Sequence, residues 1–466
     1  MSAPDLTAAT MGSFRDSGSD QHVTLLLGAG ASAASGLPGW EELAVRLLRA
    51  SGSVPDQDAA WLLVNRQDPL LVAEAARRRL GKRWDQYVRA ALYSNLNDLS
   101  PSPLHIAAAS HALAGDLGES TVITLNFDTL IEDAIDEAGD AVTAEPRIDD
   151  QRPAGTIPVH HLHGVASVRE SQDVVLTLSD FNELLGDPDS WQQRLLIACA
   201  KKGAIVIAGT SYRDPDVRRW LHVALAAPDA SNALVLLARE SFHVTRPEFD
   251  QIKEALADQW SAAGLTPVIL EDHSDAAQII RELRHLHAPG YRAPQERAAT
   301  LWQAHVDSFQ DLQQAYSDQL LSDATSLCTA FNVDRLNATL WIADGQGNVA
   351  RYAAQDRCFR SIDDVRHVPS GHDSQWIAGR ALGAEATVFQ DLQEGTTSRW
   401  GTVFATPIRV ELDGLPGIAS AVLSVGLPGS AETYFQSTAM WMDTTLDIAV
   451  DWGERLVAST GSVSRT

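Results

Sequence analysis

Cysteine and lysine are both scarce in this chain of 466 residues. Its three cysteines, Cys199, Cys328 and Cys358, lie far apart, which excludes a disulfide framework and a zinc site built from four thiolates. Only 4 of the 36 basic residues are Lys, and 61 acidic residues bring the formal net charge to −25. Because nothing global supports a basic face, neither nucleic acid nor an anionic membrane is an expected partner.

Long apolar runs are missing as well. No uninterrupted stretch approaches the roughly 20 residues that cross a bilayer, and residues 1–21 lack the apolar core of a signal peptide. We therefore expect no membrane partner and a cytoplasmic location. What is present is an ordinary globular composition, with 45% hydrophobic and 21% charged residues, in a chain long enough for two or three domains.

Strand-like and helical stretches alternate from residue 22 to about residue 287. Short runs that are apolar on both faces predict buried parallel strands, with helices between them. The alternation predicts the α/β class, with a doubly wound parallel sheet of the Rossmann type. The predicted strands are Val23–Leu27, Val122–Leu125, Ala204–Ala208, Ala233–Leu237 and Thr266–Leu270.

Composition also predicts the domain limits. Residues 1–20 are polar and are expected to form a flexible leader, followed by the α/β domain over 21–288. Residues 55–115 fit poorly as a single crossover and predict an inserted helical module or lid. Residues 289–298 contain Pro and Gly and predict a linker. Residues 299–466 predict an α+β domain, in which a long helix precedes antiparallel strands and a closing helix.

The first motif, Gly28–Ala29–Gly30–Ala31–Ser32, directly follows a predicted strand. Glycines let backbone amides approach a pyrophosphate, and a helix that starts there favours negative charge. A tight strand-to-helix turn without a ligand explains the same residues. The third glycine of the dehydrogenase fingerprint is missing at its usual spacing.

The second motif is Thr124–Leu125–Asn126–Phe127–Asp128, again at the end of a strand. Asn126 and Asp128 can both face the crevice in which open α/β sheets bind ligands. Either side chain can instead cap the helix that follows, and on local grounds the cap is favoured.

The third motif contains His160, His161 and His163, followed by Gly164. Without nearby Cys or a second cluster, no metal is expected here. His163 suits a general base on a loop, since the ordinary histidine pKa is about 6.5. A buried strand histidine with a backbone partner is the alternative, and the roles of His160 and His161 stay open.

The fourth motif, which spans 209–216, follows the strand Ala204–Ala208. Its small polar residues can bind ribose hydroxyls, and Gly209, Ser211 and Asp216 are the predicted contacts. The segment also reads as a helix start, with Pro215 in the first turn.

Taken in order, the four motifs resemble the sirtuin NAD-binding fold over residues 22–287. Together with Gly36–Trp40, they look most like the sirtuin-like domains of prokaryotic antiviral defence proteins, which cleave NAD. The resemblance implies that NAD is the substrate and that Gly28–Ser32 and the fourth motif bind it. It also implies catalytic roles for the polar residues of the second and third motifs, namely Asn126, Asp128 and His163.

Two departures from deacetylating sirtuins favour hydrolysis over deacylation. Leu125 stands where those enzymes usually carry Gln, and the chain cannot build their four-cysteine zinc module. The expected activity is therefore cleavage of NAD to nicotinamide and ADP-ribose by an antiphage effector. The alternatives are a regulator that binds NAD or ADP-ribose without turnover, and a protein deacylase or ADP-ribosyltransferase.

The C-terminal region, about 300–455, resembles a GAF small-molecule sensor. The resemblance rests on Trp376–Leu382 before Asp391, on Val403–Ile408, and on Ile418–Val425. It implies a domain that regulates the enzyme, through a small-molecule or phage-derived activator or by forming a homo-oligomer.

Overall fold

The structure is a computed structural model that describes residues 5–17, 22–94, 99–115, 119–145, 155–187, 189–210, 215–227, 229–392, 399–435 and 437–461. The chain divides into two compact units. The N-terminal unit is Ser13–Arg284, and the C-terminal unit combines His285–Thr466 with Met1–Gly12. No helix in the described ranges has both the length and the apolarity needed to cross a bilayer.

The N-terminal unit is built on a seven-stranded sheet with the order β3-β4-β2-β1-β7-β8-β9, in which every neighbouring pair is parallel. The predicted doubly wound parallel sheet is therefore confirmed. Two strands, β3 and β4, were not predicted because polar residues interrupt their short apolar runs. The strands are β1 (Val23–Leu27), β2 (Ser120–Thr124), β3 (Val142–Glu145), β4 (Ile157–His161), β7 (Ala204–Ala208), β8 (Ala233–Ala238) and β9 (Thr266–Leu270).

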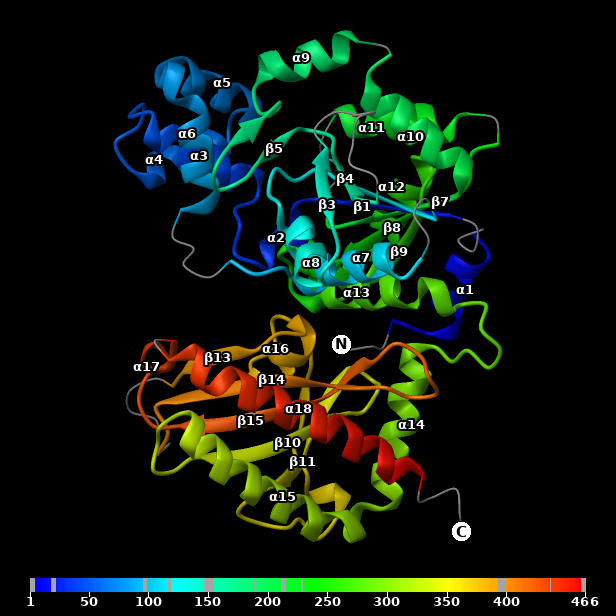
Figure 1. Cartoon of the computed structure of the whole chain (residues 1–466), viewed down its shortest axis with the longest axis vertical. Helices are drawn as coiled ribbons and strands as arrows, with labels where there is room; N and C mark the ends of the chain where they lie inside the picture. Colours follow the sequence, from blue (N-terminus) through cyan, green and yellow to red (C-terminus); the bar gives the residue numbers. More distant parts are fainter. Residues whose placement is uncertain are drawn as a thin grey trace. The chain divides into compact units, whose positions relative to one another are not determined.

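Helices cover both faces of this sheet (Figure 1). On one face, apolar side chains of β1, β2, β7 and β8 form one hydrophobic cluster with Leu196, Trp220 and Trp260 from three helices. Burial of such side chains contributes roughly 1.5–3 kcal/mol each and holds the layers together. The helices are α10 (Trp191–Lys202), α11 (Pro215–Leu225) and α12 (Arg246–Ala262) on that face, and α7 (Pro103–Leu113), α8 (Leu130–Glu137) and α13 (His273–Glu282) on the other.

The helical insertion has other limits than predicted. Its helices pack on one another, and three of the four share a hydrophobic cluster with Phe127 of the second motif. Helix α7, which the prediction placed inside the module, packs instead against α8, α13 and β2 as the crossover into β2. The module consists of α3 (Trp40–Ala50), α4 (Gln57–Val64), α5 (Pro69–Leu80) and α6 (Trp84–Tyr93).

Neither the predicted leader nor the predicted linker is open chain throughout. Residues 8–15 form helix α1 (Ala8–Arg15), and Leu6 and Met11 are buried. The Gln295 N–H donates to Leu6 O at 3.2 Å, which ties the start of the chain to the C-terminal unit. Helix α14 begins at Pro294, inside the predicted linker. Apolar residues among the polar ones explain the difference at residues 1–20, because they can be buried.

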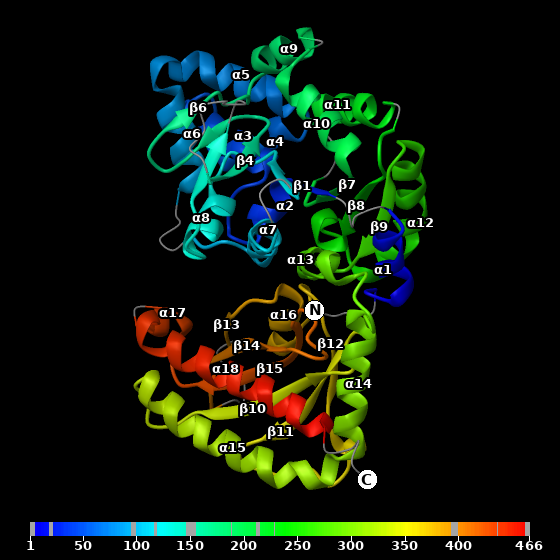
Figure 2. The ribbon, with the colours of Figure 1, turned by 45° about the vertical axis from the view of Figure 1, so that its right-hand side comes forward.

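The C-terminal unit contains an antiparallel six-stranded sheet with the order β12-β11-β10-β15-β14-β13. Helices α15 and α18 share one hydrophobic cluster with this sheet, and α16 (Ile377–Ala384) packs against β14 and β15 (Figure 2). The long helix that the sequence predicts at the start of this domain is broken at Ser308 into α14 (Pro294–Asp307) and α15 (Phe309–Ala330). The other elements are β10 (Asn337–Ala343), β11 (Asn348–Ala354), β12 (His367–Pro369), β13 (Val388–Asp391), β14 (Thr402–Val410), β15 (Ile418–Leu427), α17 (Ala431–Phe435) and α18 (Thr438–Gly461).

Candidate active site

All four motifs lie at the carboxyl ends of neighbouring strands of the parallel sheet, in the spatial order β4-β2-β1-β7. Since these strands are parallel, their carboxyl ends meet at one edge, where open α/β sheets bind ligands. Backbone hydrogen bonds continue from the strands into the loops and hold the loops side by side. These bonds are Leu162 N to Thr124 O (3.0 Å), Leu125 N to Leu27 O (2.8 Å) and Gly28 N to Ala208 O (2.9 Å).

The glycines of the first motif are explained by a close approach between two loops. A Cβ atom on Gly28 would lie 2.7 Å from Gly209 O, and one on Gly30 would lie 2.8 Å from Gly209 Cα. The Gly30 N–H donates to Gly209 O (2.8 Å) and the Ala31 N–H to Gly28 O (2.9 Å). The Gly28 N–H also donates, to Ala208 O of β7. Three of the five backbone amides that were predicted to bind phosphate therefore donate to carbonyl groups of this chain.

Asn126 bridges the first and second motifs. Its Nδ2 donates to Gly28 O at 3.1 Å and to Ser32 Oγ at 2.8 Å. Because Gly28 O can only accept a hydrogen bond, the Asn126 side-chain atom that faces it must be the amide nitrogen and not the amide oxygen. Both N–H groups of the side chain are therefore used, and Oδ1 is the atom that Asn126 can still offer to a ligand.

Asp128 makes the contact of the capping alternative for the second motif and also binds Ser32. Its Oδ2 accepts from the Ser32 hydroxyl at 2.8 Å, and its Oδ1 accepts from Leu130 N at 3.2 Å at the start of α8. The carboxyl is buried, and burial raises its pKa against the opposing hydrogen bonds from Ser32 and Leu130. Asp128 is thus both a helix cap and the anchor of Ser32.

His105, which the sequence reading missed, completes the contacts of Ser32. Its Nδ1 accepts from Ser102 N at 3.1 Å, so its Nε2 carries the proton and faces Ser32 Oγ at 3.3 Å. Burial lowers the pKa of His105 to about 4, which keeps the ring neutral near pH 7. The available signal was the helix start at Ser102–Pro103, where a histidine takes the third position of a capping box.

His163 has its backbone beside the second motif and its ring between two helices. The adjoining chain is tied there by Ala166 N donating to Phe127 O at 2.6 Å. The imidazole is 3% exposed and packs between Phe181 of α9 (Leu178–Gly186) and Trp220 of α11, with ring centroids 5.4 and 5.9 Å away. The two segments predicted to form one site are therefore neighbours.

A series of aromatic rings links these motifs. Trp40, at the end of Gly36–Trp40, lies 6.3 Å from the Phe127 ring and 6.3 Å from the Phe181 ring. Phe181 in turn contacts His163. Aromatic pairs at these separations contribute roughly 0.5–1.5 kcal/mol each beyond burial. The series joins the helical module to the second and third motifs.

The other two histidines of the third motif each pair with a carboxylate. His160 Nδ1 lies 3.2 Å from Glu145 Oε2, and His161 Nε2 lies 2.6 Å from Glu132 Oε1. His161 is fully buried, and its Nδ1 lies 2.9 Å from Asn126 O. The sequence alone assigns neither histidine a role, whereas the structure gives each a carboxylate partner.

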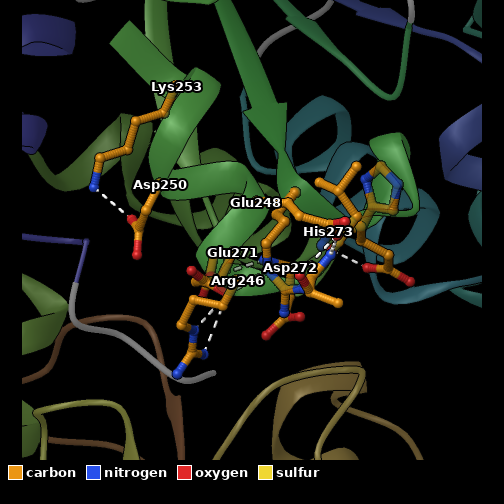
Figure 3. A network of polar contacts seen from close by, with 12 residues as sticks. Arg246, Glu248, Asp250, Lys253, Glu271, Asp272 and His273 are labelled. Carbon is orange, nitrogen blue, oxygen red and sulfur yellow. Dashed lines mark hydrogen bonds and ion pairs between the residues drawn. The ribbon is translucent and has the colours of Figure 1, made fainter.

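The loops after β8 and β9 carry a second polar network that the sequence reading also missed (Figure 3). Glu271 Oε2 accepts from buried Arg239 Nε at 2.8 Å and pairs with Arg246 at 3.2 Å. His273 Nε2 lies 3.2 Å from Ser241 Oγ, and its ring lies beside Gly30. The charged run after Thr266–Leu270 was the available signal.

Two predicted ligand residues cannot be placed. Ser211 lies outside the described residues, and so does the side chain of Asp216, whose backbone belongs to α11. Gly209, the other predicted contact in this motif, lies against the first motif and accepts a hydrogen bond from Gly30 N.

Comparison with known proteins gives one family match. Residues 120–268, which carry the second, third and fourth motifs, match the family described as the SIR2-like domain. A solved structure described as "Structural Basis for the Mechanism and Regulation of Sir2 Enzymes" shares 16% identity, with a TM-score of 0.35, over 60% of this chain and 99% of that chain. No curated protein matches the chain.

Proposed function

We propose that the N-terminal unit hydrolyses NAD, releasing nicotinamide and ADP-ribose. The match to the SIR2-like domain supports NAD-dependent activity in general. The observation that carries the proposal is the order of the four loops: they follow four neighbouring parallel strands and are hydrogen-bonded to one another at the carboxyl edge. A dinucleotide laid across that edge would meet Gly209 and Gly28–Ser32 along one part and Asn126 and the third motif along another.

The chemistry assigned to this edge is attack of water on the ribose carbon that carries nicotinamide. The transition state resembles an oxocarbenium ion, as in glycoside hydrolysis, and nicotinamide leaves with the bonding electrons. Asn126 Oδ1 would accept a hydrogen bond from the water or a ribose hydroxyl, since its Nδ2 is already engaged. His163 would take the proton that the water loses. The contacts of Asp128 favour a role in ordering the loop.

The test is incubation of purified protein with NAD, followed by chromatography of nicotinamide and ADP-ribose. We expect Asn126→Ala to lose at least a hundredfold in turnover, because an unoriented water forfeits much of the benefit of positioning. Asn65→Ala, at an exposed position of the same unit, is the matched control and should retain the parent rate. Parent-rate nicotinamide release by a folded Asn126→Ala protein would refute the assigned site.

A second candidate is a regulator that binds NAD or ADP-ribose without turnover. It is favoured by the 3% exposure of His163 and by the engagement of the Gly28, Gly30 and Ala31 amides within the chain. Calorimetric binding of NAD with no product at any protein concentration would support this candidate. Nicotinamide release that requires an added protein acceptor would instead indicate a deacylase or an ADP-ribosyltransferase.

The C-terminal unit is proposed to regulate the hydrolase as a GAF-like sensor or by pairing two copies of the chain. An unregulated NAD hydrolase would harm its own cell, so an activator is expected, either a small molecule or a phage component. The antiphage role is proposed from the resemblance of the motifs to sirtuin-like domains of antiviral defence proteins. Pairing is supported by an exposed apolar row on α18, formed by Met442, Leu446 and Val450 at helical spacing. Light scattering of the parent and of Leu446→Asp tests the pairing, since a dimer through this row should become a monomer.

A further inference from the structure

The final residue of β4, His161, sits between the second motif and helix α8. Its ring is fully buried, with Nδ1 at 2.9 Å from Asn126 O and Nε2 at 2.6 Å from Glu132 Oε1. Asn126 thus has its carbonyl held by His161, and its N–H donates to Thr124 Oγ1 at 3.0 Å. Both backbone polar groups of this residue are fixed by side chains.

The chemistry of the two partners determines the proton count on His161 and Glu132. A backbone carbonyl can only accept, so Nδ1 of His161 carries a proton and donates it to Asn126 O. A second proton must lie between Nε2 and Glu132 Oε1, because two lone pairs would repel at 2.6 Å. Whether that proton resides on the ring or on the carboxyl, the pair has no net charge.

Glu132 is buried, and its carboxyl group is paired with His161. The residue is 7% exposed, and its other oxygen, Oε2, is buried with no hydrogen-bond partner in the part of the chain that the structure describes. Burial alone would lower the pKa of His161, but the charge of Glu132 and its hydrogen bond outweigh burial and raise it. A buried carboxylate is costly unless it is paired, and the contact with His161 offsets that cost for Glu132.

We infer that His161 and Glu132 are positioning residues that hold Asn126 for the reaction. The carbonyl anchor fixes the backbone of Asn126, while Gly28 O and Ser32 Oγ fix its Nδ2. Together these contacts leave Oδ1 aimed in one direction. A shift of about 1 Å in such a group can cost a hundredfold in rate. This inference rests on the proposed hydrolase function.

Two substitutions at Glu132 test whether its hydrogen bond to His161 Nε2 is what positions Asn126. In Glu132→Gln, the amide N–H can donate to Nε2, and Nδ1–H still donates to Asn126 O, so turnover should stay within about threefold of the parent. Glu132→Ala removes the anchor and should lower kcat about ten- to hundredfold with little change in KM. Glu137→Ala, an exposed glutamate on the same helix, is the control and should match the parent.

A double-mutant cycle with Asn126→Ala tests whether Glu132 affects the rate through Asn126. If Glu132 acts through Asn126, Glu132→Ala should cost nothing further in the Asn126→Ala background. Additive losses, or equal losses for the Gln and Ala variants, would overturn the inference. Amide exchange of the 124–130 segment gives a readout that does not depend on activity, and it should be faster in Glu132→Ala but not in Glu132→Gln. Unchanged exchange in Glu132→Ala overturns the inference, whereas an inactive parent overturns only the hydrolase proposal.

Discussion

The two units both bury polar networks, but they bury them in different places. In the N-terminal unit, Asn126, Ser32 and Asp128 lie where strands end and loops begin. In the C-terminal unit, His305 Nε2 bonds Tyr316 OH at 3.0 Å, and Trp452 Nε1 donates to Asp323 at 2.7 Å. Those contacts join α14, α15 and α18, which pack on the antiparallel sheet.

The difference teaches that a buried polar network is not by itself a site. Between packed helices, every polar group needs a partner because water is excluded, and the network serves the scaffold. At the carboxyl edge of a parallel sheet, the same types of bond lie where open α/β sheets bind ligands, and there they hold side chains such as Asn126. Position in the fold thus separates the candidate site from the buried network of the second unit. The following substitutions test that separation.

The largest effect is expected at His163. His163→Ala should lower nicotinamide release about 10²–10⁴-fold, since that is the usual contribution of one positioned acid or base. His305→Gln alters a histidine that is equally buried in the other unit and should leave the rate within about twofold. Steady-state kinetics on variants with parent-like circular dichroism provide the comparison. Equal losses in both variants would mean that the two networks do not differ in function.

Gly30→Ala should break the junction of the first and fourth motifs. The added Cβ would lie 2.7 Å from the His273 ring and 2.8 Å from Gly209 Cα, so a loop must move. We expect a loss of about 1–3 kcal/mol in the free energy of unfolding, as for other overpacked sites. Gly186→Ala, where nothing lies within 4 Å of the added atom, should be neutral. Urea unfolding measures both, and a neutral Gly30→Ala would contradict the close approach.

The network of the C-terminal unit should respond to pH rather than to substrate. Burial lowers the pKa of His305 to about 4, whereas an unfolded chain has a value near 6.5. Between these values only the unfolded state binds the proton, so stability is complete above pH 6.5 and falls as the pH drops towards 4. From pH 7 to pH 5 this one group should cost about 2 kcal/mol.

Urea unfolding at the two pH values checks this prediction. His305→Gln should remove that part of the pH dependence, while the exposed His287→Gln should leave it intact. An unchanged pH dependence in His305→Gln would show that His305 titrates alike in the folded and unfolded chains.

The smallest effect is expected where the helical module meets α9. Arg77 Nη1 lies 2.6 Å from Asp180 Oδ1 and 3.1 Å from Thr177 Oγ1, but the Arg77 side chain is 42% exposed. Solvent screens such a pair, so Arg77→Ala should lose about 0.2–1 kcal/mol of unfolding free energy. The exposed Arg78→Ala supplies the baseline, and a loss of several kcal/mol at Arg77 would show that the module depends on this contact.

Much of the fold could be predicted because its signals are local. The strands Val23–Leu27, Ala204–Ala208 and Thr266–Leu270 have the predicted bounds, since a short run that is apolar on both faces suits a buried parallel strand. β3 was missed because Thr143 and Glu145 interrupt its short run, which is therefore not apolar on both faces. Residues 1–20 were misjudged because a few apolar residues among polar ones reveal nothing about where they pack.

The candidate site, like the fold, could be predicted only in part from the sequence. The amino-acid sequence determined that four polar or glycine-rich loops each follow a strand, and in parallel strands chain direction alone brings such loops to one edge. Only the tertiary structure decided what each side chain does there: that Gly28 and Gly30 admit the Gly209 loop, that Asn126 Nδ2 binds the first motif, and that His161 pairs with Glu132. The physical reason is the separation along the sequence over which each interaction acts. Strand and helix preferences act over a few neighbouring residues, whereas a hydrogen bond between residues 29 or 98 apart depends on how the whole sheet is assembled.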